Sequence, residues 1–440
     1  MAEPQFEAGT QLRVAGTNVS CVIDRVIGEG GQGTVYAATV GTSTYALKWY
    51  RPGMADADLR RRIPILIDRG SPDPRFLWPI EQITDEAGLG FGYLMPLAPQ
   101  GFRELFTLFT PLGAGASSRF DLRGRAQLAI DIVDCFLKLH ASGFCYRDIN
   151  LGSFLIDPVS RAIRVCDNDN IDVNGTSSPS VGTMMFMAPE LVRGEAAPST
   201  DTDLFSLAVL LFYLLTDGHP LMGQAECAIE YPDASDWQRL LGLEPCFMFD
   251  PHDARNAAVP GVHDRQIAIW NTLPFGLREL FVRTFGEGLA SPRRRTLPSE
   301  WHSMLAIVRD TAITCGCPTQ FDTVVSGDEA TADVNCACSL CGADLPPVHR
   351  LEIAGARIVL TSNAKLLASQ VGGAINGSDR TIGEMAKSPA GRDGLRNVGD
   401  AEWRVNDKSG QSAAVPPGRA VTLTPGVQIN FGRVTGTILD

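Results

Sequence analysis

Hydrophobic and polar residues alternate with a strand-like period near the start of the chain. The stretches "CVIDRVIGEG", "TVYAATV" and "TYALKWY" within residues 21–50 are separated by glycine-rich turns, and such alternation predicts β-strands. A helical pattern follows at 55–68, and shorter strands continue to about Leu97. This part of the chain therefore predicts a lobe made mainly of strands.

The middle of the chain has a helical period instead. Apolar residues recur every three or four positions in "LRGRAQLAIDIVDCFLKLH" (122–140), and helical segments predominate from Glu190 to Ile307. A strand-rich lobe joined to a helix-rich lobe predicts a two-lobed α+β unit with a cleft between the lobes. Beyond about residue 348, short runs such as "RLEIAG", "RIVLTS" and "WRVNDKSG" between Gly and Pro turns predict a β-sandwich.

Length and charge narrow the class of protein. A chain of 440 residues suggests about two to four domains. The net charge of −12 argues against a nucleic-acid surface and against binding to an anionic membrane. The N-terminus has no signal-peptide pattern, and the apolar run from Leu204 to Leu215 is too short to span a bilayer. We expect a cytoplasmic protein with neither nucleic acid nor membrane as a partner.

The eleven cysteines are unevenly distributed. Six lie singly up to Cys246, whereas five are crowded from Cys315 onward, which favours a local metal site over a disulfide framework. "CSLCG" has two residues between its thiolates, a spacing that lets both bind one zinc ion. We expect a closed, non-catalytic Zn²⁺ site with Cys336 as a spare thiol, and a redox switch is the alternative. The expected ligands are Cys315, Cys317, Cys338 and Cys341.

A glycine-rich segment, "IGEGGQGTVY", separates two of the predicted N-terminal strands. Because a strand and not a helix follows these glycines, a dinucleotide-binding turn is disfavoured, and a β-hairpin whose backbone amides approach phosphates is favoured. In "YALKWY", Lys48 points to the opposite side of the strand from Leu47 and Trp49. A lysine within an apolar strand indicates an anionic partner such as a nucleotide phosphate. The alternative is a surface lysine on an edge strand.

These residues and several later ones resemble, in the same order, the motifs of eukaryotic-type protein kinases. The resemblance covers roughly residues 10–310. It includes a catalytic-loop triplet, a metal-binding aspartate, the tripeptide that closes the activation segment, the aspartate of a buried helix, and a late arginine expected to pair with Glu190. The matching residues are Gly28, Gly30, Gly33, Val35, Ala46, Lys48, Tyr146, Arg147, Asp148, Asp167, Asn168, Asp169, Ala188, Pro189, Glu190, Asp203 and Arg295.

The resemblance implies a two-lobed protein kinase fold and phosphoryl transfer from ATP with Mg²⁺. Lys48 is expected to hold the α- and β-phosphates, and Asp167 to bind Mg²⁺. Asp148 is expected to accept the proton of the incoming hydroxyl. The other expected nucleotide-binding residues are the gatekeeper Met95, the hinge residues Pro96 and Ala98, and Val35, Ala46 and Leu155 around the adenine ring.

Four departures from the kinase pattern bear on activity. Ser153 stands where a metal-binding asparagine is expected, and Asn150 replaces a lysine that contacts the γ-phosphate. Asp169 replaces the glycine of the metal-binding motif and offers a second carboxylate for Mg²⁺. The helix at 55–68 contains no glutamate to pair with the strand lysine, and Asp68 is the expected substitute.

Two functional interpretations follow. An atypical, autophosphorylating protein serine/threonine kinase retains Lys48, Asp148 and Asp167, and its protein substrate carries a Ser or Thr hydroxyl. The alternative is a pseudokinase scaffold that binds nucleotide and partners without efficient catalysis. The hydroxyl-rich segment 170–187 is expected to be either a polar loop or a site of autophosphorylation, with Arg147 pairing with the added phosphate.

The final segment is similar to forkhead-associated domains, which bind phosphothreonine peptides, in "RTIGEM" and in the strands from Trp403 onward. That family has an arginine directly after its Ile-Gly pair, whereas this chain has Glu384 there. Arg380 and Arg396 are candidate substitutes. A phosphate-independent docking or autoinhibitory domain is the alternative.

The whole arrangement resembles bacterial eukaryotic-like kinases with zinc-knuckle and forkhead-type tails. Some of these, in tellurite-resistance-associated operons, accompany a von Willebrand A-type protein and a metal-dependent serine/threonine phosphatase, which are therefore expected partners. The expected domains are a protein kinase domain at 10–310 (N-lobe 10–97, C-lobe 98–310), a zinc-knuckle module at 312–345 and a forkhead-associated-like β-sandwich at 348–440.

Overall fold

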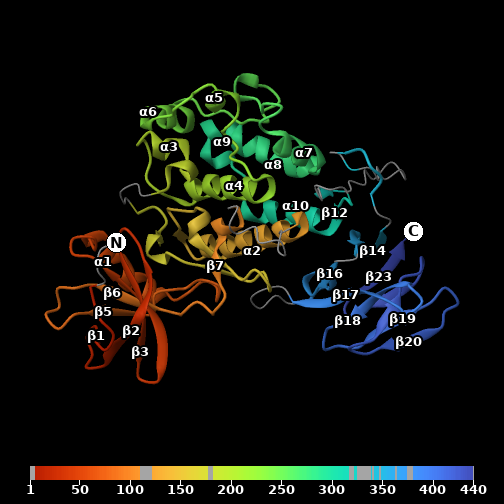
Figure 1. Cartoon of the computed structure of the whole chain (residues 1–440), viewed down its shortest axis with the longest axis horizontal. Helices are drawn as coiled ribbons and strands as arrows, with labels where there is room; N and C mark the ends of the chain where they lie inside the picture. The colour runs from red at the N-terminus through yellow and green to blue at the C-terminus, as the bar shows by residue number, and fades with distance from the viewer. Residues whose placement is uncertain are drawn as a thin grey trace.

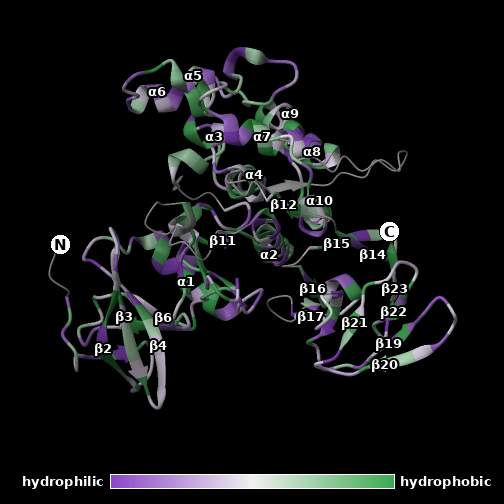
Figure 2. Cartoon of the chain, turned by 45° about the vertical axis from the view of Figure 1, so that its right-hand side comes forward, coloured by the Kyte–Doolittle hydropathy of each residue, from purple (hydrophilic) through white to green (hydrophobic). Residues whose placement is uncertain are grey.

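The structure is a computed structural model with three parts: a β-barrel near the N-terminus, a central group of helices, and a group of strands near the C-terminus (Figure 1). The barrel and the C-terminal strands lie on opposite sides of the central helices, as Figure 2 also shows. The residues described are 5–109, 121–176, 182–316, 322–324, 338, 341–345, 348–361, 364–373 and 380–439.

The N-terminal part is a closed barrel of strand order β1-β2-β3-β4-β6-β5. Leu47 and Trp49 belong to the core inside the barrel, whereas Ala46 and Tyr50 belong to the core shared with the helices. This alternation confirms the predicted strand around Lys48 and turns the lysine towards the helical part. The strands are β1 (Gln11–Val14), β2 (Ser20–Glu29), β3 (Gly33–Val40), β4 (Ser43–Tyr50), β5 (Glu81–Thr84) and β6 (Gly92–Met95).

Helix α1 (Ala57–Arg69) follows the barrel strand β4 and confirms the helix predicted at 55–68. It begins at the N-cap Asp56, whose side chain accepts a hydrogen bond from the Leu59 amide at 2.7 Å. Its buried face has helical spacing and includes Leu59, Arg62, Ile63 and Leu66. The arginine on this otherwise apolar face becomes important at the candidate site.

Two long helices form the centre of the helical part. Helix α2 (Leu122–Ala141) matches the helical period of the sequence, and α4 (Thr200–Thr216) is buried along nearly its whole length, as its apolar run predicts. Among the described residues, no helix is both long enough and apolar enough to cross a membrane. The other helices are α3 (Pro189–Val192), α5 (Gln224–Cys227), α6 (Ala234–Gln238), α7 (Asp264–Thr272), α8 (Phe275–Phe285), α9 (Glu287–Ala290) and α10 (Pro298–Thr311).

A buried ion pair fixes helix α3 to the rest of the helical part. Arg295 donates to both carboxylate oxygens of Glu190 at 2.7 and 2.8 Å, which confirms the pairing expected from sequence. The same guanidinium donates to the carbonyls of Gly288 and Asp201 at 3.0 and 2.8 Å. Because every charge in this cluster has a partner, its burial costs less than that of a lone ion.

Short strands hold two candidate catalytic segments next to each other. The first segment is the 146–153 loop, and the second begins at residue 166. The hairpin of β9 and β10 brings the end of the first segment beside the start of the second. Strand β8, which precedes the first segment, pairs with β11, which follows the second. Both segments therefore have fixed ends. The strands are β7 (Arg103–Glu104), β8 (Phe144–Cys145), β9 (Phe154–Ile156), β10 (Ile163–Val165) and β11 (Asp172–Val173).

The C-terminal part contains two antiparallel sheets around one hydrophobic core, the arrangement expected of a sandwich. One sheet has the order β15-β14-β23-β22-β19-β20 and the other β16-β17-β18-β21. Four of these strands, β16, β17, β18 and β20, lie outside the runs from which strands were predicted. The strands are β14 (His349–Ile353), β15 (Ala356–Leu360), β16 (Lys365–Leu367), β17 (Thr381–Lys387), β18 (Asp393–Asn397), β19 (Trp403–Asn406), β20 (Ser412–Val415), β21 (Ala420–Thr422), β22 (Gln428–Asn430) and β23 (Thr435–Leu439).

The C-terminal strands are joined to the helical part by partly buried contacts that the sequence did not indicate. Arg123 in α2 donates to the carbonyls of Ala312 and Val359 at 3.0 and 2.8 Å. Gln370 donates to the carboxylate of Asp310, at the end of α10, at 2.5 Å. The side chain of Val359 belongs to the hydrophobic core of the helical part. The last strands are therefore packed against the helices and are not merely tethered to them.

Candidate active site

The glycine-rich segment forms the turn of the β2–β3 hairpin. Gly30 donates to the Gly33 carbonyl at 2.9 Å, and a strand follows, so the hairpin interpretation is confirmed. A Cβ on Gly33 would lie 2.1 Å from the Trp49 carbonyl oxygen, so packing against β4 requires a glycine there. Gly28 and Gly30 have no such close neighbour. Packing therefore explains why residue 33 is a glycine. It does not explain Gly28 and Gly30, which fit the expectation that the backbone of this turn approaches a phosphate closely.

Lys48 is buried within the barrel wall. Its strand β4 pairs with both β3 and β6, so the alternative of a surface lysine on an edge strand is wrong. The ammonium donates to both carboxylate oxygens of Asp169, at 2.8 and 2.9 Å, and to Asp167 at 3.3 Å. Burial alone would lower the pKa of Lys48, but Asp169 and then Asp167 raise it to about 12. The lysine is therefore positively charged at neutral pH.

Asp167 and Asp169 follow strand β10 and have very different surroundings. The side chain of Asp167 is 52 % exposed, on a residue with a left-handed φ of 53°. The Asp169 carboxylate is buried and also accepts hydrogen bonds from the hydroxyls of Tyr50 and Tyr93, the latter at 3.1 Å. Burial raises the pKa of Asp169, but Lys48 and these hydrogen bonds outweigh it and hold the pKa below its usual value.

This geometry weighs against Asp169 as a second Mg²⁺ ligand, and that role stays a prediction. Both of its oxygens are occupied by donors of the chain itself, so the carboxylate serves the lysine. The sequence reasoning missed Tyr50 and Tyr93. A signal for Tyr50 was present, because it lies two residues after Lys48 and so shares the same strand face.

The expectation that Asp68 pairs with Lys48 is wrong. Asp68 is exposed near the end of α1, and the lysine contacts Asp169 instead. The residue of α1 that reaches this site is Arg62, whose Nη2 donates to the Asp169 carbonyl at 3.0 Å. Arg62 also forms an ion pair with Asp58 one turn earlier. The helix therefore presents a cation to the site.

Asp148 lies in a loop held from both sides. Its carboxylate accepts hydrogen bonds from the Thr183 amide at 2.8 Å, the Thr183 hydroxyl at 3.0 Å and the Asn150 side chain at 3.0 Å. The backbone amides of Tyr146 and Arg147 donate to the buried carboxylate of Asp203 at 2.7 and 3.1 Å. Thr183 was predicted as one of the hydroxyls of a polar loop or of an autophosphorylation site, and the structure brings it to the candidate catalytic carboxylate.

Ser153 does not have the surroundings expected of a metal ligand. Its hydroxyl donates to the Asp148 carbonyl at 2.9 Å and accepts from the Asn150 amide at 3.1 Å. The side chain is buried and stabilises the loop. Of the three groups predicted to bind Mg²⁺, only Asp167 combines an exposed carboxylate with proximity to Lys48.

Arg147 has acidic neighbours within the protein. Its guanidinium lies 3.7 Å from Asp58 and 3.8 Å from Asp172, so an added phosphate would compete with two carboxylates. The predicted phosphorylation sites Ser177, Ser178 and Ser180 lie outside the described residues. Thr176 is described, and its hydroxyl donates to the Val173 carbonyl at 2.8 Å.

The residues predicted to surround adenine belong to one region of the structure. Met95 ends β6 and is paired with Ala46 of β4, and both side chains are in the core shared by the barrel and the helices. Val35, Ala98 and Leu155 are partly buried and pack against the same core, while Pro96 is exposed. Residues from β3, β4, β6 and β9 thus contribute to one large core, and their contact with adenine stays a prediction.

Three of the predicted zinc ligands lie together. The sulfur atoms of Cys315, Cys338 and Cys341 are within 4.8 Å of one another, and those of Cys315 and Cys341 are 3.7 Å apart. Three thiols at this separation suit a tetrahedral zinc site that lacks one ligand. The fourth predicted ligand, Cys317, and the spare thiol, Cys336, lie outside the described residues.

Both arginines considered as phosphate ligands in the C-terminal strands have acidic partners. Arg380 forms an ion pair with Asp400, and Arg396 lies 3.4 Å from Glu384. A phosphate would have to displace these carboxylates. The arrangement favours the docking alternative over phosphopeptide binding.

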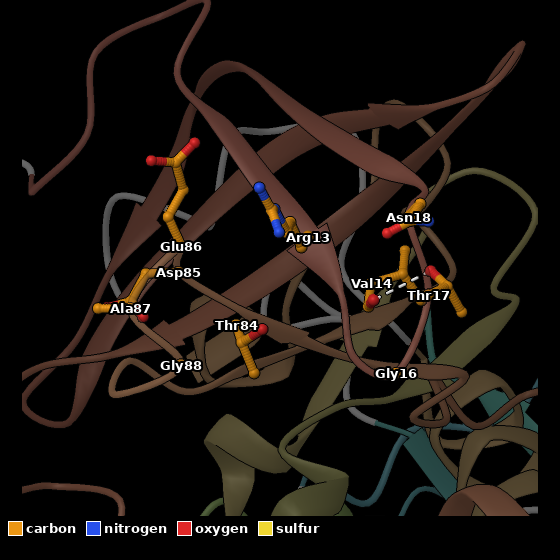
Figure 3. Close-up of a pocket in the computed structure, with 10 residues that line it drawn as sticks. All are labelled: Arg13, Val14, Gly16, Thr17, Asn18, Thr84, Asp85, Glu86, Ala87 and Gly88. Carbon is orange, nitrogen blue, oxygen red and sulfur yellow. Dashed lines mark hydrogen bonds between the residues drawn. The ribbon is translucent and has the colours of Figure 1, made fainter.

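A surface hollow of about 370 Å³ lies elsewhere, between the turns that follow β1 and β5 (Figure 3). It is open and polar, and none of the predicted site residues lines it. We assign it no role. Its lining residues are Arg13, Val14, Gly16, Thr17, Asn18, Thr84, Asp85, Glu86, Ala87 and Gly88.

Comparison with known proteins supports the kinase interpretation. The family "Protein kinase domain" matches residues 100–256, which include both candidate catalytic segments, so the chain contains a protein kinase domain. The boundaries predicted at 10 and 310 extend beyond this match and stay predictions.

Several kinases are similar to parts of the chain. The dual serine/threonine and tyrosine protein kinase of Gallus gallus is 35 % identical over 119 residues, which are 27 % of this chain and 12 % of the relative. That of Danio rerio is 36 % identical over 28 % of this chain and 13 % of the relative. A probable serine/threonine-protein kinase PknB of Corynebacterium glutamicum is 25 % identical over 48 % of this chain and 33 % of the relative. The chain thus spans about a third or less of these relatives' lengths, and the similarity supports a protein serine/threonine kinase.

Proposed function

We propose that this chain is a protein serine/threonine kinase that uses ATP and Mg²⁺ to phosphorylate a protein hydroxyl. The observation that carries the proposal is the contact between Lys48 of the barrel and Asp167 of the helical part, whose motifs are 119 residues apart in the sequence. Folding brings together a buried ammonium and an exposed carboxylate. This is the charge arrangement that phosphoryl transfer requires.

Each residue of the site has a chemical task under this proposal. The charged Lys48 attracts the phosphates of the nucleotide, and the exposed Asp167 offers the hard oxygen ligand that Mg²⁺ prefers. Bound Mg·ATP supplies the phosphoryl group. Asp148, aligned by Thr183 and Asn150, accepts the proton that the substrate hydroxyl loses. The Gly28–Gly33 hairpin covers the phosphates with its backbone amides.

A direct test is phosphoryl transfer by the purified full chain. With labelled ATP and Mg²⁺, we expect label to appear on the chain or on an added protein substrate. Asp148→Asn removes the proton acceptor with little change in size, and should lower the rate by about 100-fold or more. Asp68→Asn, an exposed aspartate of α1, is the matched control. Equal labelling by the wild-type chain and Asp148→Asn would contradict the proposal.

The pseudokinase scaffold is the second candidate, and two observations favour it. Asn150 replaces the lysine expected at the γ-phosphate, and the Ser153 hydroxyl is used within the loop. If the chain is a scaffold, the wild type and Asp148→Asn should bind Mg·ATP with equal affinity, and neither protein should transfer label. The same pair of proteins therefore separates the two candidates.

Autophosphorylation is a further part of the proposal. Thr176, Thr183 and the serines at 177, 178 and 180 are the candidate acceptors, and mass spectrometry of the chain after incubation with ATP would locate the phosphate. Phosphate on Thr183 would place negative charge beside the Asp148 carboxylate, which its hydroxyl contacts at 3.0 Å. Modification at that position should therefore inhibit the enzyme.

For the cysteine cluster we propose a structural Zn²⁺ site. The supporting observation is that three soft thiol ligands, from residues 315, 338 and 341, lie within 4.8 Å of one another. Cys317 is the proposed fourth ligand. Zinc would tie the segment after α10 to the segment before β14, and so would support the packing of the C-terminal strands.

Metal analysis of the purified chain tests the zinc proposal. We expect about one Zn²⁺ per chain, lost in Cys338→Ser and retained in Cys227→Ser, an exposed cysteine outside the cluster. A redox switch would instead give a metal-free chain whose cluster thiols become resistant to alkylation after oxidation. That result would contradict the zinc assignment.

The C-terminal strands are proposed to be a forkhead-associated-like sandwich that works by docking. Two observations support this role over phosphopeptide binding. Arg380 and Arg396 each have an acidic partner within the chain, and Arg123 contacts these strands from the helical part. A cognate serine/threonine phosphatase and a von Willebrand A-type protein remain proposed partners on the basis of resemblance. Co-purification with the full chain and with Arg396→Ala would test whether this surface holds them.

A further inference from the structure

We propose that Asp169 is the residue that positions the phosphate-binding lysine, in place of the helix glutamate that the kinase pattern would supply. The inference rests on the proposed kinase function and deepens it. It assigns to this chain a lysine–carboxylate pair whose acid comes from the segment after β10. The acid does not come from helix α1.

The contacts of Lys48 carry the inference. Its ammonium lies 2.8 and 2.9 Å from the two oxygens of Asp169, but 3.3 Å from a single oxygen of Asp167. The Asp169 side chain is 3 % exposed, whereas that of Asp167 is 52 % exposed. Asp169 is thus the permanent partner of the lysine, and Asp167 is left accessible to solvent and to a metal ion.

Two tyrosines fix the position of the Asp169 carboxylate. Tyr50 from β4 and Tyr93 from β6 each donate a hydroxyl hydrogen bond to it, so it is held by neighbouring strands of the barrel. Burial, followed by the charge of Asp169, raises the pKa of both phenols well above the usual value, which keeps them protonated as donors. With three donor groups around it, the carboxylate has one position relative to Lys48.

The charges of α1 explain why this arrangement replaces the usual one. Arg62 reaches the site from the buried face of the helix, where a glutamate would be needed, and donates to the Asp169 backbone carbonyl at 3.0 Å. The adjacent Arg61 contacts Asp172, also in the segment after β10, at 3.3 Å. The helix therefore binds this segment through cations, and the segment supplies the acid.

A mechanical consequence follows. Asp167 and Asp169 are two residues apart, so the metal-binding carboxylate and the partner of the lysine move together. A movement of α1 would break the contacts of Arg62 and Arg61 but would leave the Lys48–Asp169 pair intact. Control of this kinase should therefore act through the 167–172 segment.

The test uses a cycle of full-length variants: Asp169→Asn, Lys48→Met and the double variant. Asp68→Asn serves as the matched control. For each we would measure the dissociation constant of Mg·ATP by calorimetry and the kcat and KM of phosphoryl transfer. Asp169→Asn should lower kcat/KM by about 10- to 100-fold, because a displaced ammonium no longer meets the phosphates. Asp68→Asn should change it by less than about twofold.

The cycle separates a positioning role from a structural one. If Asp169 acts through Lys48, adding Asp169→Asn to Lys48→Met should weaken Mg·ATP binding by less than about twofold, because the lysine is already gone. If Asp169→Asn weakens Mg·ATP binding as much in the Lys48→Met background as it does in the wild type, the inference is overturned. An unchanged kcat/KM in Asp169→Asn would also overturn it.

A second pair of variants covers the case in which Asp169→Asn does not fold. Asp169→Glu and Asp169→Gln have the same length and differ in charge, so the Glu variant should retain at least about tenfold more activity. Equal activity in the two would contradict the inference. If Lys48→Met itself leaves Mg·ATP binding and transfer unchanged, the proposed kinase function fails. If it abolishes them while Asp169→Asn does not alter them, only this inference fails.

Discussion

Acidification should destabilise the protein through one buried histidine, His219. The ring is 3 % exposed and has a hydrogen-bond partner at each nitrogen. Nε2 is 2.7 Å from the Met185 carbonyl, and Nδ1 accepts from the Leu221 amide at 3.1 Å. Only the neutral ring with its proton on Nε2 satisfies both partners, because a protonated Nδ1 would face another N–H group.

The sign and size of the effect follow from the pKa of His219. Burial lowers this pKa from 6.5 to about 4 in the folded protein. The unfolded chain therefore binds a proton first, and stability is lost as pH falls from about 6.5 towards 4. Between pH 7.5 and 5, this single group should reduce the free energy of unfolding by about 2 kcal/mol.

Urea unfolding at pH 7.5 and pH 5 measures this loss. His219→Gln should be less stable than the wild type at pH 7.5. Between the two pH values, however, its free energy of unfolding should fall by about 2 kcal/mol less than that of the wild type. His252→Gln, an exposed histidine, should keep the wild-type pH dependence. If His219→Gln and the wild type lose equal stability between these pH values, the reasoning is refuted. Because Met185 follows Thr183 closely, protonation should also loosen the segment that contacts Asp148.

Three other perturbations have defined outcomes. Thr183→Val removes a hydroxyl donor to Asp148 and should lower kcat by about tenfold or more with unchanged Mg·ATP affinity, as steady-state kinetics and calorimetry would measure. Arg295→Ala leaves the Glu190 carboxylate buried without its partner and should cost about 3–5 kcal/mol in urea unfolding, whereas a loss below about 1 kcal/mol would contradict the role of this pair. Arg123→Ala removes the Nη2 group that donates to two carbonyls, so proteolysis should release the C-terminal strands faster than in the wild type, and an unchanged rate would show that the packing does not depend on it.

Local patterns predicted several elements of the kinase region because burial gives regular strands and helices a periodic sequence. Alternation along β4 put Lys48 on the face opposite Leu47 and Trp49, and the structure has the same arrangement. The strand after the glycines predicted a hairpin, and the apolar run at 204–215 predicted a buried helix. In each case the burial of one element determines which of its own residues face inward.

Contacts between distant segments were not predictable in the same way. The partner of Lys48 is 121 residues away, so no local pattern distinguishes Asp169 from the other acids of the chain. The choice of Asp68 assumed that the acid must come from the helix, and the cationic face of α1 excludes that. The role of Arg123 likewise depends on carbonyls 189 and 236 residues away.

Calorimetry of Mg·ATP binding tests the central claim most directly, namely that Lys48 and Asp167 together hold a magnesium nucleotide. The wild-type chain should bind Mg·ATP, and Lys48→Met and Asp167→Asn should each weaken binding by about tenfold or more, with Asp68→Asn unchanged. Binding that is absent from the wild type, or equally strong in all four proteins, would contradict the account.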